Sequence, residues 1–198
     1  MTSKPSRTQS EEVRKGQLLD AARKIFKEKS YESATVSEIA TEAGLGKGTF
    51  YYYYPSKTAV AAALRDGLMN RMAEAIQGST QTKTTFEEKL NSLVATTFRM
   101  AGQNADLMKL AFVGADETHM ELHSESAEHA AFLRVTTDLL STANKEGDLK
   151  SIDPGIAGRL IVGLIQQAVI ESFVTGDIDD AQKLESGVKI LITNALVK

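Results

Sequence analysis

Apolar residues recur at helical spacing through almost the whole of this 198-residue chain. Only three prolines interrupt it, and the alternation of apolar and polar residues that marks a half-buried strand is rare. The pattern therefore predicts an all-α fold of about nine helices. With their caps, the expected helices span residues 10–29, 35–44, 47–53, 56–77, 84–102, 105–115, 122–146, 153–175 and 179–197.

The composition excludes several kinds of site. No cysteine is present, so the chain has neither a disulfide framework nor a thiolate that binds metal or acts as a nucleophile. The segment MTSKPSRTQSEEVRKG lacks the apolar stretch of a signal peptide, and no run approaches the roughly 18 apolar residues of a membrane span. We therefore expect a soluble, cytoplasmic protein without a membrane partner.

The two parts of the chain differ in charge. Residues 1–66 hold 11 lysines and arginines against 8 acidic residues, whereas residues 67–198 hold 12 against 18. A mildly basic region joined to an acidic body indicates an anionic partner at the basic end. The polar residues 1–10 are expected to form a flexible arm, with Ser10 as the N-cap of the first helix.

Two short helices joined by a glycine turn lie close to the N-terminus. Thr35 is a good N-cap and Glu38 follows three residues later, which is a capping box. This helix ends at Gly44, and the next short helix ends before Pro55. Such a pair forms a helix-turn-helix, whose second helix enters the major groove of DNA while the first crosses the phosphate backbone. Short helix pairs are common, so the spacing alone leaves an ordinary helix pair open.

The segment TVSEIATEAGLGKGTFYYYYPSK, residues 35–57, resembles the DNA-binding signature of TetR-family transcriptional regulators. The likeness extends from the first helix to the start of the fourth, and the rest resembles the family only in its all-helical layout. The resemblance implies a helix-turn-helix head, residues 1–57, and a ligand-binding and dimerisation body, residues 58–198. It implies a homodimeric repressor that leaves its double-stranded DNA operator when a small-molecule effector binds the body.

Four consecutive tyrosines, Tyr51 to Tyr54, follow the turn. Phe50 and Tyr54 share one helix face and are expected to pack inward, whereas Tyr51 and Tyr53 are expected to face outward and Tyr52 projects on a third side. A tyrosine ring packs on a sugar or a thymine methyl group while its hydroxyl donates to a phosphate. The resemblance also implies that Lys57 grips the DNA backbone. The candidate DNA-binding residues are Thr35, Ser37, Lys47, Gly48, Thr49, Tyr51, Tyr52, Tyr53 and Lys57.

Some details of this candidate interface stay open. Thr35 and Ser37 stand at the amino end of a helix, where a side chain either caps the helix or helps to bind a phosphate. Gly46 replaces a serine that is frequent in the family, which removes a hydroxyl that could reach DNA. Tyr54 stands where phenylalanine is usual and must place an extra hydroxyl. Both departures leave the base preference undetermined.

The body offers apolar residues from which a ligand pocket could be built. Phenylalanine and methionine at helical spacing more often form ordinary core, and the sequence does not separate core from pocket. Gln166, a polar residue on an apolar helix, could orient a ligand or cross a dimer interface. The candidate pocket residues are Phe86, Leu90, Leu93, Phe98, Leu107, Met108, Phe112, Phe132 and Gln166.

The last two expected helices, within residues 153–197, have more apolar surface than a monomer is expected to bury. In the first of them, apolar residues cover most of the circumference, which predicts burial on nearly all sides. Two adjacent helices of this kind favour a helix-bundle interface between two copies of the chain. Ordinary core within one chain is the alternative.

No metal site, cofactor or catalytic group is assigned. His119 and His123 lie one turn apart near acidic residues, as zinc or nickel ligands can, but a solvated helix end with incidental histidines explains them as well. GLGKGT follows a helix and lacks the spacing of a phosphate-binding loop, so an enzyme is not expected. Two rival functions are a ligand- or metal-sensing module without DNA binding, and a helical adaptor that recruits a different protein.

Overall fold

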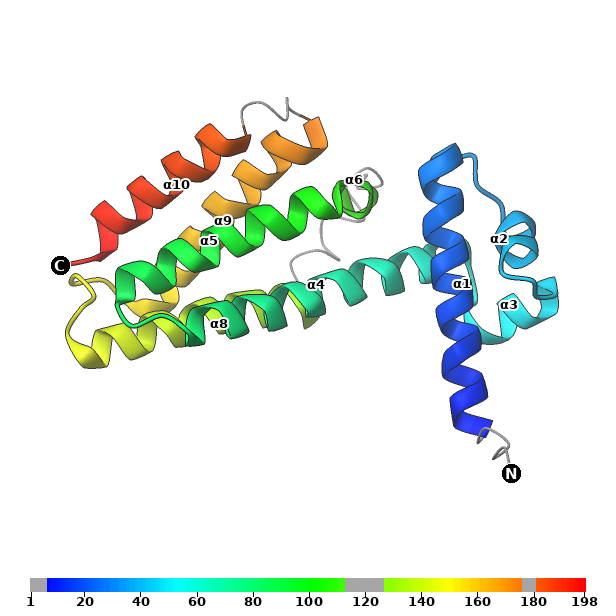
Figure 1. The fold of residues 1–198 in the computed structure, drawn as a ribbon, viewed down its shortest axis with the longest axis horizontal. Helices are drawn as coiled ribbons and strands as arrows, with labels where there is room; N and C mark the ends of the chain where they lie inside the picture. The colour runs from blue at the N-terminus through cyan, green and yellow to red at the C-terminus, as the bar shows by residue number, and fades with distance from the viewer. Residues whose placement is uncertain (1–6, 113–126, 176–180) are drawn as a thin grey trace. The chain divides into compact units, whose positions relative to one another are not determined.

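The computed structural model describes residues 7–112, 127–175 and 181–198, and their fold is helical, as predicted (Figure 1). In this part of the chain the only β-pairing is an isolated bridge between Leu149 and Val197. The helices are α1 (Arg7–Lys29), α2 (Val36–Glu42), α3 (Lys47–Tyr53), α4 (Lys57–Gln81), α5 (Phe86–Gln103), α6 (Ala105–Phe112), α8 (Ala127–Glu146), α9 (Pro154–Ile170), the π-helix η1 (Glu171–Thr175) and α10 (Ala181–Leu196).

The chain divides into two compact units, Met1–Asp66 and Gly67–Lys198. The division falls within α4, whereas the sequence-based boundary lies at residue 57, the start of that helix. The first turns of α4 therefore pack with the N-terminal unit. The N-terminal unit coincides with the mildly basic region of the sequence.

The N-terminal unit is built around one apolar cluster. Helix α2 packs on α1 and on α3. Phe50 from α3 and Leu18 from α1 are completely buried, as is Ile39 from α2, so each of the three helices contributes a fully buried anchor. The remaining buried apolar residues of this unit are Ala21, Ala22, Ile25, Phe26, Ala34, Ala40, Val60 and Leu64.

Two helix ends differ from the prediction. Helix α1 begins at Arg7, so Ser10 lies inside the helix instead of capping it, and residues 7–10 are not part of an arm. Helix α4 continues to Gln81 instead of ending near Gln77. The hydroxyls of Ser79 and Thr80 donate to the carbonyl of Ile76 at 3.0 and 2.9 Å. Hydroxyl groups that bond back to the preceding turn allow serine and threonine to remain within a helix, where the sequence predicted a break.

In the C-terminal unit, α9 packs on α8, and α10 packs on α5 and α9. Helix α9 begins with Asp153 as N-cap and Pro154 in its first turn. Gly158 permits the close packing of α8 on α9, because a methyl group there would lie 2.6 Å from Oγ1 of Thr137. Leu140 and Ile165 are completely buried in this unit, from α8 and α9 respectively.

The end of α9 was predicted as ordinary helix but forms the π-helix η1. The buried Ser172 hydroxyl donates to the carbonyl of Ala168 at 2.7 Å. The ring of Phe173 packs edge-on against Phe98, with the ring centroids 6.2 Å apart. Parts of three expected helices, residues 113–115, 122–126 and 179–180, lie outside the described residues, as do His119 and His123.

Within the single chain, one face of α9 is exposed, so the predicted burial on nearly all sides is not reached there. Ile156, Leu160 and Leu164 follow one another at four-residue spacing and are exposed, Leu160 to 64%. In α10, Ile190 and Leu191 are also exposed. The helices of the described C-terminal unit cover the opposite face of α9 and leave this row open.

One helical segment of the described chain, Pro154–Thr175, is long and apolar enough to cross a membrane by length and composition alone. Polar residues such as Arg159 and Gln167 interrupt it, and part of it is buried against its neighbours in the C-terminal unit. A core helix of a soluble protein meets the same criteria, so the segment is weak evidence for a membrane span.

Candidate nucleic-acid interface

The N-terminus of α2 is closed by the predicted capping box. Thr35 adopts an extended conformation, its hydroxyl accepts from the Glu38 amide at 3.3 Å, and its own amide donates to Oε2 of Glu38 at 3.0 Å. The Thr35 hydroxyl also donates to Oε2 at 2.9 Å. Donor and acceptor of this hydroxyl are thus used within the cap, whereas Ser37 is exposed on the first turn.

Ion pairs fasten α2 to α1. Lys29 lies 2.5 Å from Oε1 of Glu38, and Lys24 lies 2.6 Å from Oε1 of Glu42. The hydrogen bond from Lys29 and those from Thr35 lower the pKa of Glu38 to about 2. All of these groups are solvent-exposed or nearly so, which limits what each pair adds to stability. The pairs set the position of α2 on α1 more than they stabilise it.

Helix α3 separates its aromatic residues by face. Phe50 is completely buried, whereas Tyr51 and Tyr52 are 49% and 72% exposed. Tyr53 is half-buried, with its ring 4.9 Å from that of Tyr52 between centroids. Tyr54 ends the helix in an extended conformation, and partial burial raises the pKa of its phenol. Outward-facing tyrosine rings and hydroxyls are therefore presented along α3.

The start of α3 is open on its outer side. Gly46 is the N-cap without a side-chain hydrogen bond, as its lack of a hydroxyl requires. Lys47 is exposed, and Thr49 is half-buried on the following turn. A methyl group at Gly48 would meet no described atom within 4 Å, so packing within the chain does not require glycine there. A flat, uncrowded helix start of this kind admits the close approach of another backbone.

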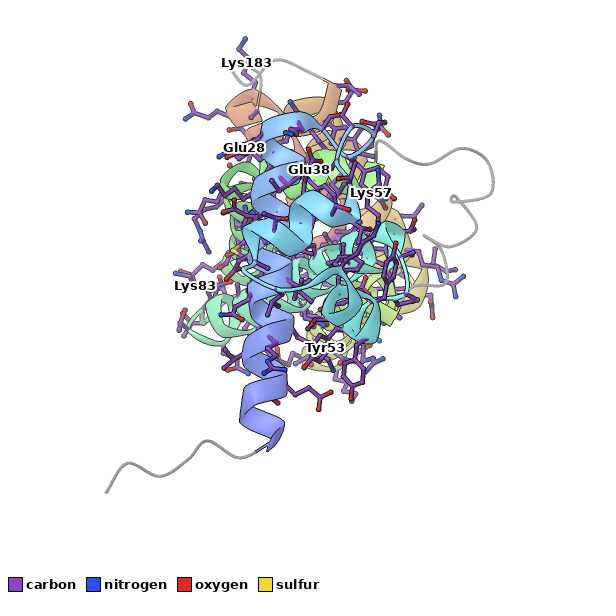
Figure 2. The ribbon with its side chains drawn as sticks, turned by 90° about the vertical axis from the view of Figure 1, so that its right-hand side faces the viewer. Glu28, Glu38, Tyr53, Lys57, Lys83 and Lys183 are labelled. Carbon is purple, nitrogen blue, oxygen red and sulfur yellow. The ribbon has the colours of Figure 1, made fainter. Side chains whose placement is uncertain are left out.

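Lys57 is placed differently from the other candidates. Its ammonium group donates to the carbonyls of Tyr31, Glu32 and Ala34 at 2.6, 3.1 and 3.0 Å. It also lies 4.5 Å from the centroid of the Tyr31 ring. An ammonium group has three N–H donors, and all three are used here within the chain. Figure 2 shows Tyr53 apart from both Lys57 and Glu38 in the N-terminal unit.

Tyr31 was not singled out from the sequence. It is the one tyrosine outside the run, and its hydroxyl lies 3.1 Å from Oγ1 of Thr58. Its ring packs edge-on against the ring of Phe26, 5.3 Å away. The available signal was weak: a lone aromatic residue just after a helix, with no periodic pattern around it.

The candidate pocket residues of the body are mostly buried in the C-terminal unit. Helix α5 packs against α6, α9 and α10 and carries four of the candidates inward, and α6 carries two more. Phe132 on α8 and Gln166 on α9 are half-buried, and the side chain of Phe112 lies outside the described residues. The buried candidates are Phe86, Leu90, Leu93, Phe98, Leu107 and Met108.

Two family models match the chain and together cover most of it. The model for bacterial regulatory proteins of the tetR family matches residues 18–64, which include all of α2 and α3. The model for the C-terminal region of YsiA-like proteins matches residues 66–195. The change from one model to the other falls at the division between the two compact units.

Similar proteins are transcriptional regulators rather than enzymes. The fatty acid metabolism regulator protein of Bacillus subtilis is 24% identical over 91% of this chain and 94% of its own length. The structure of the fatty acid degradation regulator FadR from Bacillus halodurans is 25% identical with a TM-score of 0.74, covering 96% of each chain.

A further solved structure shares the fold at lower identity. FadR from Bacillus subtilis in complex with stearoyl-CoA is 23% identical with a TM-score of 0.71, covering 91% of this chain and 98% of that one. Both family models, the full-length relatives and the helix-turn-helix geometry of α2 and α3 agree. The chain belongs to the TetR family of bacterial regulatory proteins, and it is a DNA-binding transcriptional regulator with a ligand-binding C-terminal domain.

Proposed function

We propose that this regulator is a cytoplasmic repressor that inserts α3 into the major groove of its operator. The observation that carries this proposal is the outer face of α3, where Tyr51 and Tyr52 are exposed on a helix anchored by the buried Phe50. The other candidates on α3 are Lys47 and Gly48, which are exposed, and Thr49 and Tyr53, which are half-buried. Phosphate contacts from hydroxyls and ammonium groups would fix the register, and ring and methyl contacts would select bases.

Helix α2 would cross the backbone beside this surface. Ser37 is exposed on its first turn, where backbone amides and the helix dipole favour a phosphate. The Thr35 hydroxyl is already used within the capping box, so Thr35 would contribute through the position of the helix start rather than through its hydroxyl.

The proposed assembly is a homodimer through α9 and α10. Ile156, Leu160 and Leu164 form an exposed apolar row on α9, and Ile190 and Leu191 are exposed on the adjacent α10. Apolar rows of this kind on neighbouring helices are typical of obligate interfaces. A dimer would place two α3 helices at half-sites about 34–36 Å apart, the repeat of the major groove.

A matched pair of substitutions tests the dimer. We expect Leu160→Glu to give a monomer in light scattering, because it buries two unpaired charges at a two-fold interface. Arg134→Glu, at an exposed position of α8, is the control and should stay dimeric. A Leu160→Glu protein that remains a dimer would show that the interface lies elsewhere.

The effector is proposed to be a fatty acyl thioester such as stearoyl-CoA. Support comes from the apolar interior that α5 and α6 provide and from the fatty-acid regulators among the similar proteins. Binding would favour a conformation whose two heads no longer match successive grooves, which releases the DNA.

A gel shift on the DNA upstream of the chain's own gene tests function and effector together. We expect a shifted protein–DNA complex that dissociates when stearoyl-CoA is added. Coenzyme A, which lacks the acyl chain, should leave the complex intact. A complex that resists both would retain the DNA-binding proposal and remove the effector. Thermal unfolding with the same two compounds gives an independent reading, because a ligand stabilises the form it binds.

A further inference from the structure

Lys57 occupies a site where an isolated lysine would be unfavourable. It is the first residue of α4, and the amino end of a helix carries a partial positive charge that repels an ammonium group. Three carbonyl oxygens and the face of the Tyr31 ring surround its Nζ atom and offset this repulsion. We call these groups the lysine cage: the carbonyls of Tyr31, Glu32 and Ala34 and the ring of Tyr31.

The lysine cage connects segments distant in sequence. The carbonyls belong to the loop between α1 and α2, more than 20 residues before Lys57. The loop begins at Ser30, which has a positive φ of 69°. It ends at Thr35, the N-cap of α2, which directly follows the cage residue Ala34. The neighbouring contact between Tyr31 and Thr58 joins the same two segments. These contacts therefore join the start of α4, which follows the helix-turn-helix in sequence, to the loop that precedes it.

We propose that Lys57 is a positioning residue: it holds the α1–α2 loop, and through it the start of α2, in the geometry needed for DNA binding. This inference rests on the proposed DNA-binding function. It differs from the role that the family resemblance implies, because an ammonium group with all three donors occupied must surrender a cage bond to reach a phosphate.

Amine labelling tests the cage in the free protein. Lys47 is exposed at the start of α3 and serves as the internal reference. An acylating reagent modifies only a free amine, so Lys57 should react at least about tenfold more slowly than Lys47, the factor expected when charge-assisted hydrogen bonds must open first. Equal reactivity of the two amines would overturn the cage. This test needs neither DNA nor a variant.

The absence of cysteine permits a second test by chemical rescue. Lys57→Cys supplies a single thiol, which is alkylated in denaturant and refolded. An aminoethyl group restores both the charge and the N–H donors, whereas a trimethylaminoethyl group restores the charge alone. The same three forms of Lys47→Cys are the control.

We expect unmodified Lys57→Cys to melt about 5 °C or more below the wild type and to bind DNA more weakly. The aminoethyl form should recover both properties, and the trimethylaminoethyl form should recover neither. In log–log plots against salt, the Lys57 forms should keep the wild-type slope, because no phosphate contact is lost. At position 47, cysteine should lower the magnitude of the salt slope by about 0.9 without changing the melting temperature. Both alkylated forms should restore the slope, because both restore the charge.

The outcomes separate the two proposals. Recovery of affinity and salt slope by the trimethylaminoethyl group at position 57 would show that Lys57 acts on DNA through its charge, which overturns the positioning role. Wild-type melting and affinity in unmodified Lys57→Cys would overturn it as well. If the wild type itself fails to bind the upstream DNA, the proposed function fails, while labelling and melting still decide whether the cage forms.

Discussion

The N-terminal unit and the C-terminal unit use their side chains in different ways. In residues 1–66, one aromatic residue of α3, Phe50, is buried and its neighbours Tyr51 and Tyr52 are exposed, so anchoring and the proposed recognition of DNA fall to different residues. In residues 67–198, the candidate ligand residues on α5 and α6 whose side chains are described are the same residues that form the core. A site made of exposed polar groups can be assigned residue by residue, whereas a site made of apolar core cannot.

The comparison extends to the polar contacts. Ion pairs, a capping box and the lysine cage hold the short helices of the first unit at defined positions. The second unit also has directional contacts, such as the capping box of Thr85 and Glu88, but its long helices pack closely as well, as Gly158 does against Thr137. Short helices bury little surface each and depend more on directional contacts than long amphipathic helices do.

The largest expected effect comes from truncating the anchor of the first unit. Phe50→Ala removes a completely buried ring and should cost about 3–5 kcal/mol, which approaches the whole stability of a small domain. Circular dichroism melting should show early loss of the N-terminal unit and a retained transition for the body. Phe98→Ala, its counterpart in α5, should destabilise the body instead. Loss of the body in the Phe50→Ala protein would mean that the two units do not unfold separately.

Next in size is the exposed face of α3. Tyr52→Ala should weaken operator binding by about 1–2 kcal/mol, roughly tenfold, because it removes the proposed ring and hydroxyl contacts with DNA. It should leave the melting temperature nearly unchanged, because a 72% exposed ring contributes little to the fold. Tyr51→Phe separates the hydroxyl from the ring at the neighbouring position. Fluorescence anisotropy gives the affinities and thermal melting checks the fold. If Tyr52→Ala lowers the melting temperature as well as the affinity, the ring stabilises the fold and the loss of affinity does not show a contact with DNA.

Gly48 distinguishes the needs of the fold from those of DNA. Alanine in a helix is favoured over glycine by up to about 1 kcal/mol, and nothing in the described chain opposes a methyl group at Gly48. Gly48→Ala should therefore raise the melting temperature and lower DNA affinity. Gly78→Ala in α4, which also meets no described atom within 4 Å, should stabilise without affecting DNA binding. Unchanged affinity in Gly48→Ala would remove this residue from the interface.

The smallest effect is the pH dependence of the α1–α2 contact. The pKa of Glu38 is lowered to about 2, so its contribution is complete above its unfolded pKa of about 4.3 and is lost as the pH falls through 2. The difference in melting temperature between wild type and Glu38→Gln should therefore be positive at neutral pH and vanish toward pH 2. A difference independent of pH would show that the carboxylate charge is irrelevant.

Much of the fold could be predicted because local signals and global packing agree. The capping box at Thr35, the end of α2 just before Gly44 and the N-cap of α9 at Asp153 depend on residues close in sequence. The end of α4 was misplaced because serine and threonine hydroxyls bonded to the preceding turn, which composition does not reveal. The π-helix at the end of α9, whose Phe173 ring packs on Phe98, was not foreseen.

The candidate interface was predictable to the extent that helical periodicity sorts residues by face. It placed Phe50 inward and Tyr51 outward, as the structure has them, whereas Tyr53, expected outward, and Tyr54, expected inward, are both half-buried. The cage around Lys57 could not be predicted, because it depends on three carbonyls whose convergence follows from the path of a loop. Surplus apolar surface on the last two helices was predicted, but not that it includes the row on α9, because periodicity does not show which neighbouring helices cover each face.

The central claim is that the N-terminal unit binds a specific operator through the outer face of α3. The most direct measurement is fluorescence anisotropy with the DNA upstream of the chain's own gene and with random DNA, at several salt concentrations. We predict tighter binding to the upstream DNA, a stoichiometry of one dimer per site, and an affinity that falls linearly in a log–log plot against salt. Equal affinity for both duplexes, or affinity independent of salt, would contradict the account.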